Sequence, residues 1–287
     1  MQGVIAVSKA RMLALVWVMA PAAIAGLWAL AVGENPLAKK GRLNEQAPFT
    51  VGLHLVLLIA QWGVYRIPLD FRLVKSKTHK DYRSEPMLVR DMLEALVLPA
   101  WCKCVIVVAD AAYAGKTLRR LPKQVTVTTR LRADAALYAL PGPRRPGERG
   151  RPRVKGNRLP ELIVLAAMTS VRWEQTRVCC YGRAQAKELA SLVCLWPTVF
   201  GAQPVRVVLV RAPGAPDGYQ LALVSTDLDA TPMVLVERYS ARWSVEVCLE
   251  ESRQLLGVGQ ARNRTRAAVE RTVPFGLLCV SLVVCWY

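Results

Sequence analysis

Residues 239–253 combine charged and aromatic side chains at a spacing that suits chemistry. Six of them would fall within about 100° of one another on a single helix: Tyr239, Arg242, Trp243, Glu246, Glu250 and Arg253. Two carboxylates among two guanidinium groups suit a place where a metal ion and phosphates meet, because each charge needs an opposite partner nearby. The alternative interpretation is a solvated helix face covered by Glu–Arg pairs.

That helix also needs a surface on which to dock. Val245, Leu249 and Leu256 form an apolar stripe beside the charged face, and this stripe predicts packing against a core.

A third acid, Asp110, follows the apolar run at residues 105–109. A short, wholly apolar run of this kind predicts a buried parallel strand. Because α/β sheets usually bind ligands at the carboxyl ends of such strands, we expect Asp110 to lie at a functional edge.

The surrounding pattern alternates strands and helices around a strand-rich middle. We predict strands in the region of residues 53–65 and 66–74, and a helix over residues 85–98 that Pro99 ends. Further strands are predicted at residues 125–129, 162–165, 205–210 and 219–224.

Residues 141–158 form a loop of Pro, Gly and Arg whose only apolar side chain is Val154. Within it, the run from Gly150 through Arg151 and Pro152 to Arg153 resembles the core of an AT-hook, an extended segment that lays arginines in a narrow A·T minor groove. The alternative is a flexible basic loop that contacts phosphates without sequence preference. Both interpretations indicate DNA.

Composition favours an anionic partner and a packed domain. The 287 residues carry a formal net charge of +18 and a hydrophobic content of 53%, which argues against a disordered basic tail. Charge alone would also fit a ribosomal or membrane-surface protein. The eight cysteines lack metal-ligand spacing and only two histidines are present, so we expect reduced cytoplasmic thiols and no zinc site.

Two apolar segments bear on membrane association. Residues 12–32 have the length of a signal peptide or membrane span, although Pro21 interrupts them. Residues 275–287 are too short to span a bilayer and predict a buried helix. A membrane-anchored basic protein is therefore one alternative, and our preferred prediction has no membrane partner.

The spacing Tyr-x2-Arg-x3-Glu-x6-Arg, from Tyr239 to Arg253, resembles the Tyr/Arg/Glu/Lys signature of bacterial insertion-sequence transposases of the DDE type, with Arg253 in the Lys place. Residues 107–113 look like the second acidic motif of that superfamily, and residues 129–156 and 260–266 are similar to neighbouring motifs. The resemblance implies a ribonuclease-H-like α/β fold: a mixed sheet flanked by helices, with a β-rich insertion before the catalytic-Glu helix.

Carried onto this chain, the resemblance divides it into four parts. These are an apolar N-terminal remnant helix (1–28), the first part of the core (29–123), the β-rich insertion (124–228) and the completion of the core (229–287).

The family chemistry uses three carboxylates to hold two divalent ions, Mg²⁺ or Mn²⁺, for an in-line phosphoryl transfer. The resemblance implies that Asp110, Glu246 and Glu34 are the metal ligands. The side chains expected to contact DNA are Tyr239, Arg242, Arg253, Arg151, Arg153 and Lys155. The implied partners are transposon ends and target DNA, bound by a homodimer in the cytoplasm at the nucleoid.

The chain departs from the family pattern at the first of the three carboxylates. Counting back from Lys40 and Gly41 places Gly33 and Glu34 where the family has two Asp residues. A longer side chain at Glu34 would shift a metal ion, and misplacement of about 1 Å can cost about a hundredfold in rate. We therefore expect a truncated or degenerate copy with weak or no catalysis, and a non-catalytic DNA-binding remnant is the alternative.

Overall fold

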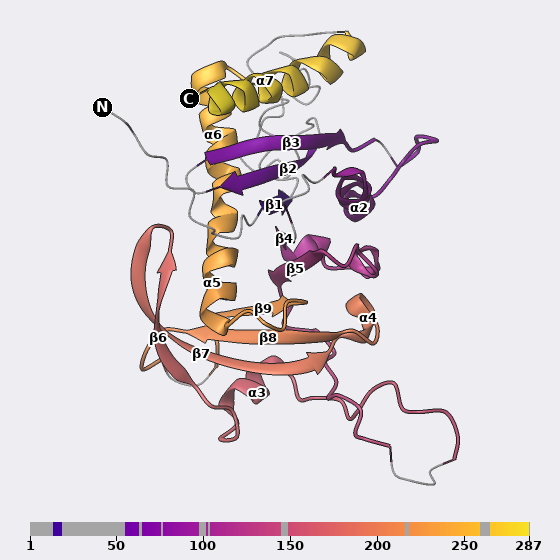
Figure 1. Ribbon diagram of the computed structural model, residues 1–287, viewed down its shortest axis with the longest axis vertical. Coiled ribbons are helices and arrows are strands. Elements are labelled where there is room, and N and C mark those ends of the chain that lie inside the picture. The colour runs from indigo at the N-terminus through magenta and orange to yellow at the C-terminus, as the bar shows by residue number, and fades with distance from the viewer. Residues whose placement is uncertain are drawn as a thin grey trace, which may run out of the picture.

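The computed structural model describes residues 14–18, 55–62, 65–75, 77–97, 102, 104–144, 149–215, 218–258 and 265–286. Glu34 and the greater part of the apolar run at residues 12–32 lie outside these ranges. The described strands form one sheet that runs the length of the molecule, with helices on both faces (Figure 1).

The first half of this sheet has mixed strand directions. Its strands are β1 Ala14–Val18, β2 Leu55–Trp62, β3 Tyr65–Leu73, β4 Val105–Ala109 and β5 Val125–Arg130. They lie side by side in the order β3-β2-β1-β4-β5, with β1, β4 and β5 parallel and β2 antiparallel to both of its neighbours. A mixed sheet with flanking helices confirms the predicted ribonuclease-H-like class. The predicted buried strand at residues 105–109 is β4, whose five residues are all buried.

The β-rich insertion extends the same sheet. Its strands are β6 Glu174–Cys180, β7 Arg183–Leu195, β8 Pro204–Arg211 and β9 Leu221–Ser225. β9 pairs antiparallel with β5, and the order continues β9-β8-β7-β6 to the far edge. The β6–β7 hairpin, which the sequence patterns do not predict, turns at Tyr181 and Gly182 with φ values of 54° and 73°. Two positive φ angles in a two-residue loop match the twist of paired strands.

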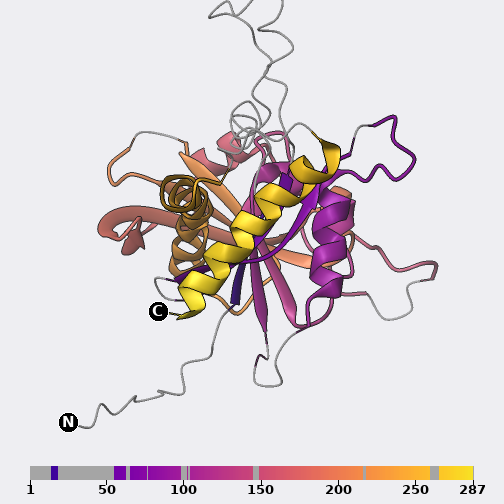
Figure 2. The ribbon, with the colours of Figure 1, turned by 90° about the horizontal axis from the view of Figure 1, so that it is seen from above.

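Alternate residues of the buried strands face opposite layers of helices, as the two-residue period of a strand requires. Val56, Leu58 and Val107 pack on the side of α2 Glu85–Ala95, α3 Leu162–Ala167 and α4 Pro197–Phe200. Leu57 and Val108 pack on the opposite side, against α6 Ser244–Leu256 and α7 Arg266–Trp286. Seen from above, α2 and α6 lie on opposite sides of the strands (Figure 2).

Three expectations about elements need correction. Residues 162–165, predicted as a strand, lie in α3, because Leu162, Leu165 and Ala166 bury one helical face at the 3–4 residue spacing. Residues 14–18 form strand β1, between β2 and β4, where the remnant helix is expected. β5 is parallel to β4 and belongs to the core half, so the boundary predicted at residue 124 falls one strand too early.

The C-terminal helix α7 is buried on one side only. Val273, Leu277 and Val280 pack into the core, while Phe275 is 67% exposed and Leu282 is 62% exposed. The burial predicted for residues 275–287 therefore holds for half of the helix surface. Among the described helices, none combines the length and the apolar character needed to cross a bilayer.

Candidate functional site

Asp110 lies directly after β4, at the carboxyl end of the parallel strands, where the sequence places it. Its Oδ1 accepts a hydrogen bond from the Ala111 N–H at 2.6 Å and so caps the short 3₁₀ turn at Ala111–Tyr113. The Thr129 hydroxyl, on neighbouring β5, donates to the Asp110 carbonyl at 3.1 Å. Strand β5 and the capped turn thus fix both the backbone and the carboxylate of Asp110.

The segment 239–253 is not the single helix that its spacing predicts. It consists of the end of α5 Pro232–Ser240, a 3₁₀ turn at Ala241–Trp243, and α6. Two serines lie at the break: Ser240 Oγ donates to the Glu237 carbonyl at 2.8 Å, and Ser244 Oγ donates to the Ala241 carbonyl at 2.7 Å. Serine side chains that bond to nearby backbone in this way compete with regular helix hydrogen bonds. Tyr239 and Arg242 consequently belong to different elements from Glu246.

The Glu246 carboxylate is bound at one oxygen only. Its Oε1 accepts from Arg242 Nη1 at 2.8 Å, and the two side chains are 25% and 20% exposed. Its Oε2 is buried and has no hydrogen-bond partner among the described residues. An unsatisfied buried carboxylate oxygen is costly, so it indicates a group, such as a cation, that completes its coordination.

Electrostatic coupling joins Asp110 to the residues of α5 and α6. Burial lowers the pKa of Arg242, but the charge and hydrogen bond of Glu246, with smaller contributions from Tyr239 and Asp110, outweigh burial and leave that pKa raised. Burial raises the pKa of Tyr239, with Asp110 adding to the rise while Arg242 and Arg130 oppose it. Asp110, at the end of β4, is thus near enough to the α5–α6 junction to influence the pKa values of Tyr239 and Arg242.

Glu250 and Arg253 lie farther along α6 than Glu246, and Glu250 lines a small pocket together with it. Glu250 is exposed and accepts a hydrogen bond from Gln254 on the same helix. Arg253, half-buried, lies in the last turn of α6. The stripe that docks α6 includes Val245 and Leu249 as predicted, but Leu256 is 41% exposed.

The fit to a metal ion rests on Asp110 and Glu246. Carboxylate oxygens are the donors that Mg²⁺ and Mn²⁺ prefer, and the unpartnered Oε2 of Glu246 is such a donor. Within the described ranges, no three His, Cys, Asp or Glu side chains lie close enough to form a complete metal site. The third predicted ligand, Glu34, lies outside those ranges. Of the three expected ligands, Asp110 and Glu246 lie within the described ranges.

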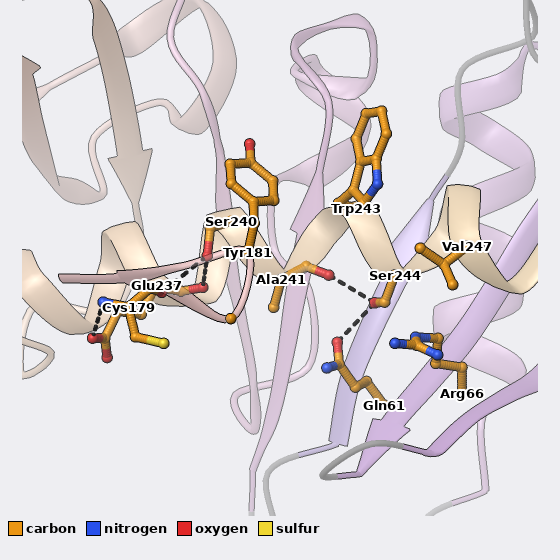
Figure 3. Close-up of a pocket in the computed structure, with 11 residues that line it drawn as sticks. Gln61, Arg66, Cys179, Tyr181, Glu237, Ser240, Ala241, Trp243, Ser244 and Val247 are labelled. Atoms are coloured by element: carbon orange, nitrogen blue, oxygen red, sulfur yellow. Dashed lines mark hydrogen bonds between the residues drawn. The ribbon is translucent and has the colours of Figure 1, made fainter. Parts of the chain in front are cut away.

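Beside this centre, a cleft of about 820 Å³ opens between the β2–β3 edge, the tip of the β6–β7 hairpin and the α5–α6 junction (Figure 3). Tyr181 and Trp243 meet edge to face at its mouth, with ring centroids 6.4 Å apart. Arg66 lines the opposite wall, and Ser244 donates to Gln61 at 2.8 Å. Of these, the sequence patterns select only Trp243. One feature distinguishes Tyr181: it precedes Gly182 in a hairpin turn and has a positive φ, which is unusual for a bulky residue.

Comparison with known proteins gives one family match and a distant structural likeness. Residues 67–189 match the family described as DDE superfamily endonuclease, a segment that runs from β3 through Asp110 into β7. A solved piggyBac transposase synaptic complex with hairpin DNA is similar at 13% identity and a TM-score of 0.45, over 84% of this chain and 42% of that chain. This chain thus spans less than half of that transposase chain. No curated protein matches the present chain. The segment that is similar to the DDE superfamily endonucleases, residues 67–189, makes up less than half of the chain.

Proposed function

We propose that this chain is a DDE transposase that cuts and joins DNA strands at transposon ends by metal-dependent phosphoryl transfer. The observation that carries the proposal is the ion pair of Arg242 and Glu246 at the α5–α6 junction, with Asp110, at the end of β4, near enough to influence the pKa of Arg242. These side chains come from segments more than a hundred residues apart, in a chain with a DDE superfamily match. A solvated face of Glu–Arg pairs would not require the acid on β4.

Asp110 and Glu246 are the side chains that would hold the divalent ions, with Glu34 as the third ligand. DDE endonucleases generally use divalent metal ions, and Mg²⁺ or Mn²⁺ suits an all-carboxylate site. When bound, such ions activate an attacking oxygen and stabilise the leaving oxygen. The chain's own contribution is placement, because Ala111 and Thr129 fix Asp110 while α6 carries Glu246.

Arg242 has a second task in this proposal, at the DNA backbone. In the protein alone its guanidinium neutralises Glu246. A DNA phosphate competes for that guanidinium, since Arg binds phosphate and carboxylate with the same planar set of donors. Transfer of Arg242 to a phosphate would release Glu246 Oε1 beside the already unpartnered Oε2. DNA binding and metal binding would then support one another.

The partner class follows from charge. A net charge of +18 favours polyanions, and Tyr239, Arg242 and Arg253 lie near or along the α5–α6 junction that presents the acids. A homodimer on DNA is part of the proposal, because joining two transposon ends requires both ends to be held together.

The test is nicking of supercoiled plasmid with Mg²⁺ or Mn²⁺ by the wild type, Asp110→Asn and Glu246→Gln. The matched control is Glu250→Gln, which removes an exposed carboxylate from the same helix. We expect nicking that requires metal, falls to background in the first two variants and persists in the control. Nicking that survives in Glu246→Gln would overturn the proposal.

A second candidate is a DNA-binding protein without catalysis. It is favoured by Glu34 standing where the family has Asp. Wild-type protein that binds DNA but does not nick it with either metal would select this candidate.

A further inference from the structure

A basic arm, residues 138–144 and 149–158, leaves the sheet beside β7 and extends away from the body of the molecule (Figure 1). Its base is firmly held. Tyr138 and Leu195 of β7 exchange two backbone hydrogen bonds, at 2.9 and 2.8 Å. Leu137, just before the arm, is 1% exposed and anchors it in the core. The arm is thus a fixed projection of the insertion.

The two sides of the arm are joined near its base. Ala139 donates its N–H to the Asn157 carbonyl, and Gly156 donates to the Ala139 carbonyl, both at 2.9 Å. A Cβ at Gly156 would lie 2.6 Å from the Leu140 carbonyl oxygen, so the close approach requires glycine. The Lys155 ammonium lies 3.8 Å from the centre of the Tyr138 ring, a cation–π contact that stiffens the same region.

The outer part of the arm presents arginines around a glycine and a proline. Arg149, Gly150, Arg151, Pro152 and Arg153 are all exposed. Gly150 has φ +100°, and no described neighbour lies within 4 Å of the place where its Cβ would be. Pro152 limits the chain to an extended course. The result is a narrow ribbon with a bare backbone between charged side chains.

We propose that this ribbon binds DNA in a narrow A·T minor groove, which deepens the proposed function and rests on its DNA partner. The minor groove is about 6 Å wide and narrows further in A-tracts, where its negative potential attracts inserted arginines. A ribbon without a side chain at Gly150 can approach the groove floor, while Arg149 and Arg151 reach along it. The weakly hydrated guanidinium suits this confined site better than an ammonium does.

A preference for A·T base pairs follows from the chemical groups on the floor of the minor groove. G·C pairs place the guanine N2 amino group there, whereas A·T pairs leave only acceptors for the arginine donors. Among the described residues of the arm, the exposed large apolar side chains are Leu140 and Val154, so the arm offers a partner little besides its arginines and Lys155. A protein groove or lipid surface would have little apolar area to bury.

The experiment measures binding of the full chain to three duplexes of about 20 base pairs that differ only at the centre: A·T, G·C or inosine·cytosine. Inosine lacks the N2 amino group but keeps the major-groove pattern of guanine. We expect the A·T and inosine duplexes to bind about tenfold more tightly than the G·C duplex. Equal affinity for all three, or an inosine duplex that behaves as G·C does, would overturn the proposal.

Two double substitutions test whether the A·T preference comes from the arm. Arg149→Ala/Arg151→Ala should abolish the A·T preference, whereas Arg172→Ala/Arg177→Ala, which removes two exposed arginines near and in β6, should keep it. Loss of the preference in the control pair, or its survival in the arm variant, contradicts the assignment. Because base preference is read from binding, it stands or falls separately from nicking by Asp110 and Glu246.

Discussion

Glu246 has one carboxylate oxygen on Arg242 and the other buried without a described partner. Ordinary buried ion pairs satisfy both oxygens, because breaking or half-satisfying them is expensive. The arrangement is better suited to a side chain that exchanges partners than to one that holds the fold together. Asp227 is a contrasting carboxylate in this chain, because both of its oxygens accept hydrogen bonds.

Asp227 accepts from Arg238 Nη1 at 2.7 Å through Oδ2 and from the Ala230 N–H at 3.1 Å through Oδ1. Burial raises its pKa, but these hydrogen bonds outweigh burial and leave the pKa below the ordinary value. A depressed folded-state pKa means that the contribution to stability is present above the unfolded pKa of about 4 and is lost as pH falls through the folded value.

We therefore predict that Asp227→Asn lowers the free energy of unfolding by about 2 kcal/mol at pH 7, since it breaks a largely buried ion pair. Urea unfolding at several pH values measures this. The gap to the wild type should shrink as pH falls below about 4. The exposed Asp229→Asn serves as control and should change little. An equal gap at pH 7 and pH 3 would contradict the assignment.

Helix α7 makes one especially close contact just after the end of α6. A Cβ at Gly276 would lie 2.5 Å from Val258 Cγ2, and Val258 is 4% exposed. Replacing glycine by alanine favours a helix by up to about 1 kcal/mol. Overpacking of a core costs about 1–3 kcal/mol, so the clash outweighs the gain.

Gly276→Ala is accordingly expected to destabilise the protein by about 1 kcal/mol, measured by urea unfolding. Addition of Val258→Ala should relieve the clash, which a double-mutant cycle would report as favourable coupling. Gly142→Ala, where no described atom lies within 4 Å, is the control and should be nearly neutral. Additive effects of the two substitutions would refute the contact.

The sequence predicts an element correctly where the pattern of apolar residues is clear. Residues 105–109 are apolar throughout, and both the strand and the placement of Asp110 at its end are confirmed. Residues 162–165 were misassigned because a short apolar run fits a strand or a helix equally well. The 3₁₀ break in residues 239–253 coincides with a hydrogen bond from Ser244 to Gln61, a tertiary contact that the periodicity of the sequence does not contain. Tyr181 escaped notice because its neighbour Trp243 is distant in sequence.

The described strands form one nine-stranded sheet, in which the insertion continues the core instead of forming a separate layer. Asp110 follows β4, the fourth strand in the order of the sheet, while the basic arm projects from the insertion half (Figure 1). This spacing would let one chain hold DNA at the centre and along the arm at the same time.

Binding through many phosphates carries a salt dependence. With a charge of +18, we predict that affinity for duplex DNA falls about a thousandfold between about 50 and about 200 mM salt, as for six or more phosphate contacts. Fluorescence anisotropy at several salt concentrations gives the slope. A slope near zero would exclude a backbone-dominated interface.

The most informative single measurement is calorimetric titration of Mn²⁺ into the DNA-bound full chain. Wild type, Asp110→Asn, Glu246→Gln and the control Glu250→Gln are compared. If the ends of β4 and the α5–α6 junction form one metal site, both acid variants should lose at least about tenfold in Mn²⁺ affinity while the control keeps it. Mn²⁺ binding that is unchanged in Asp110→Asn and Glu246→Gln would contradict the shared site on which the proposed chemistry depends.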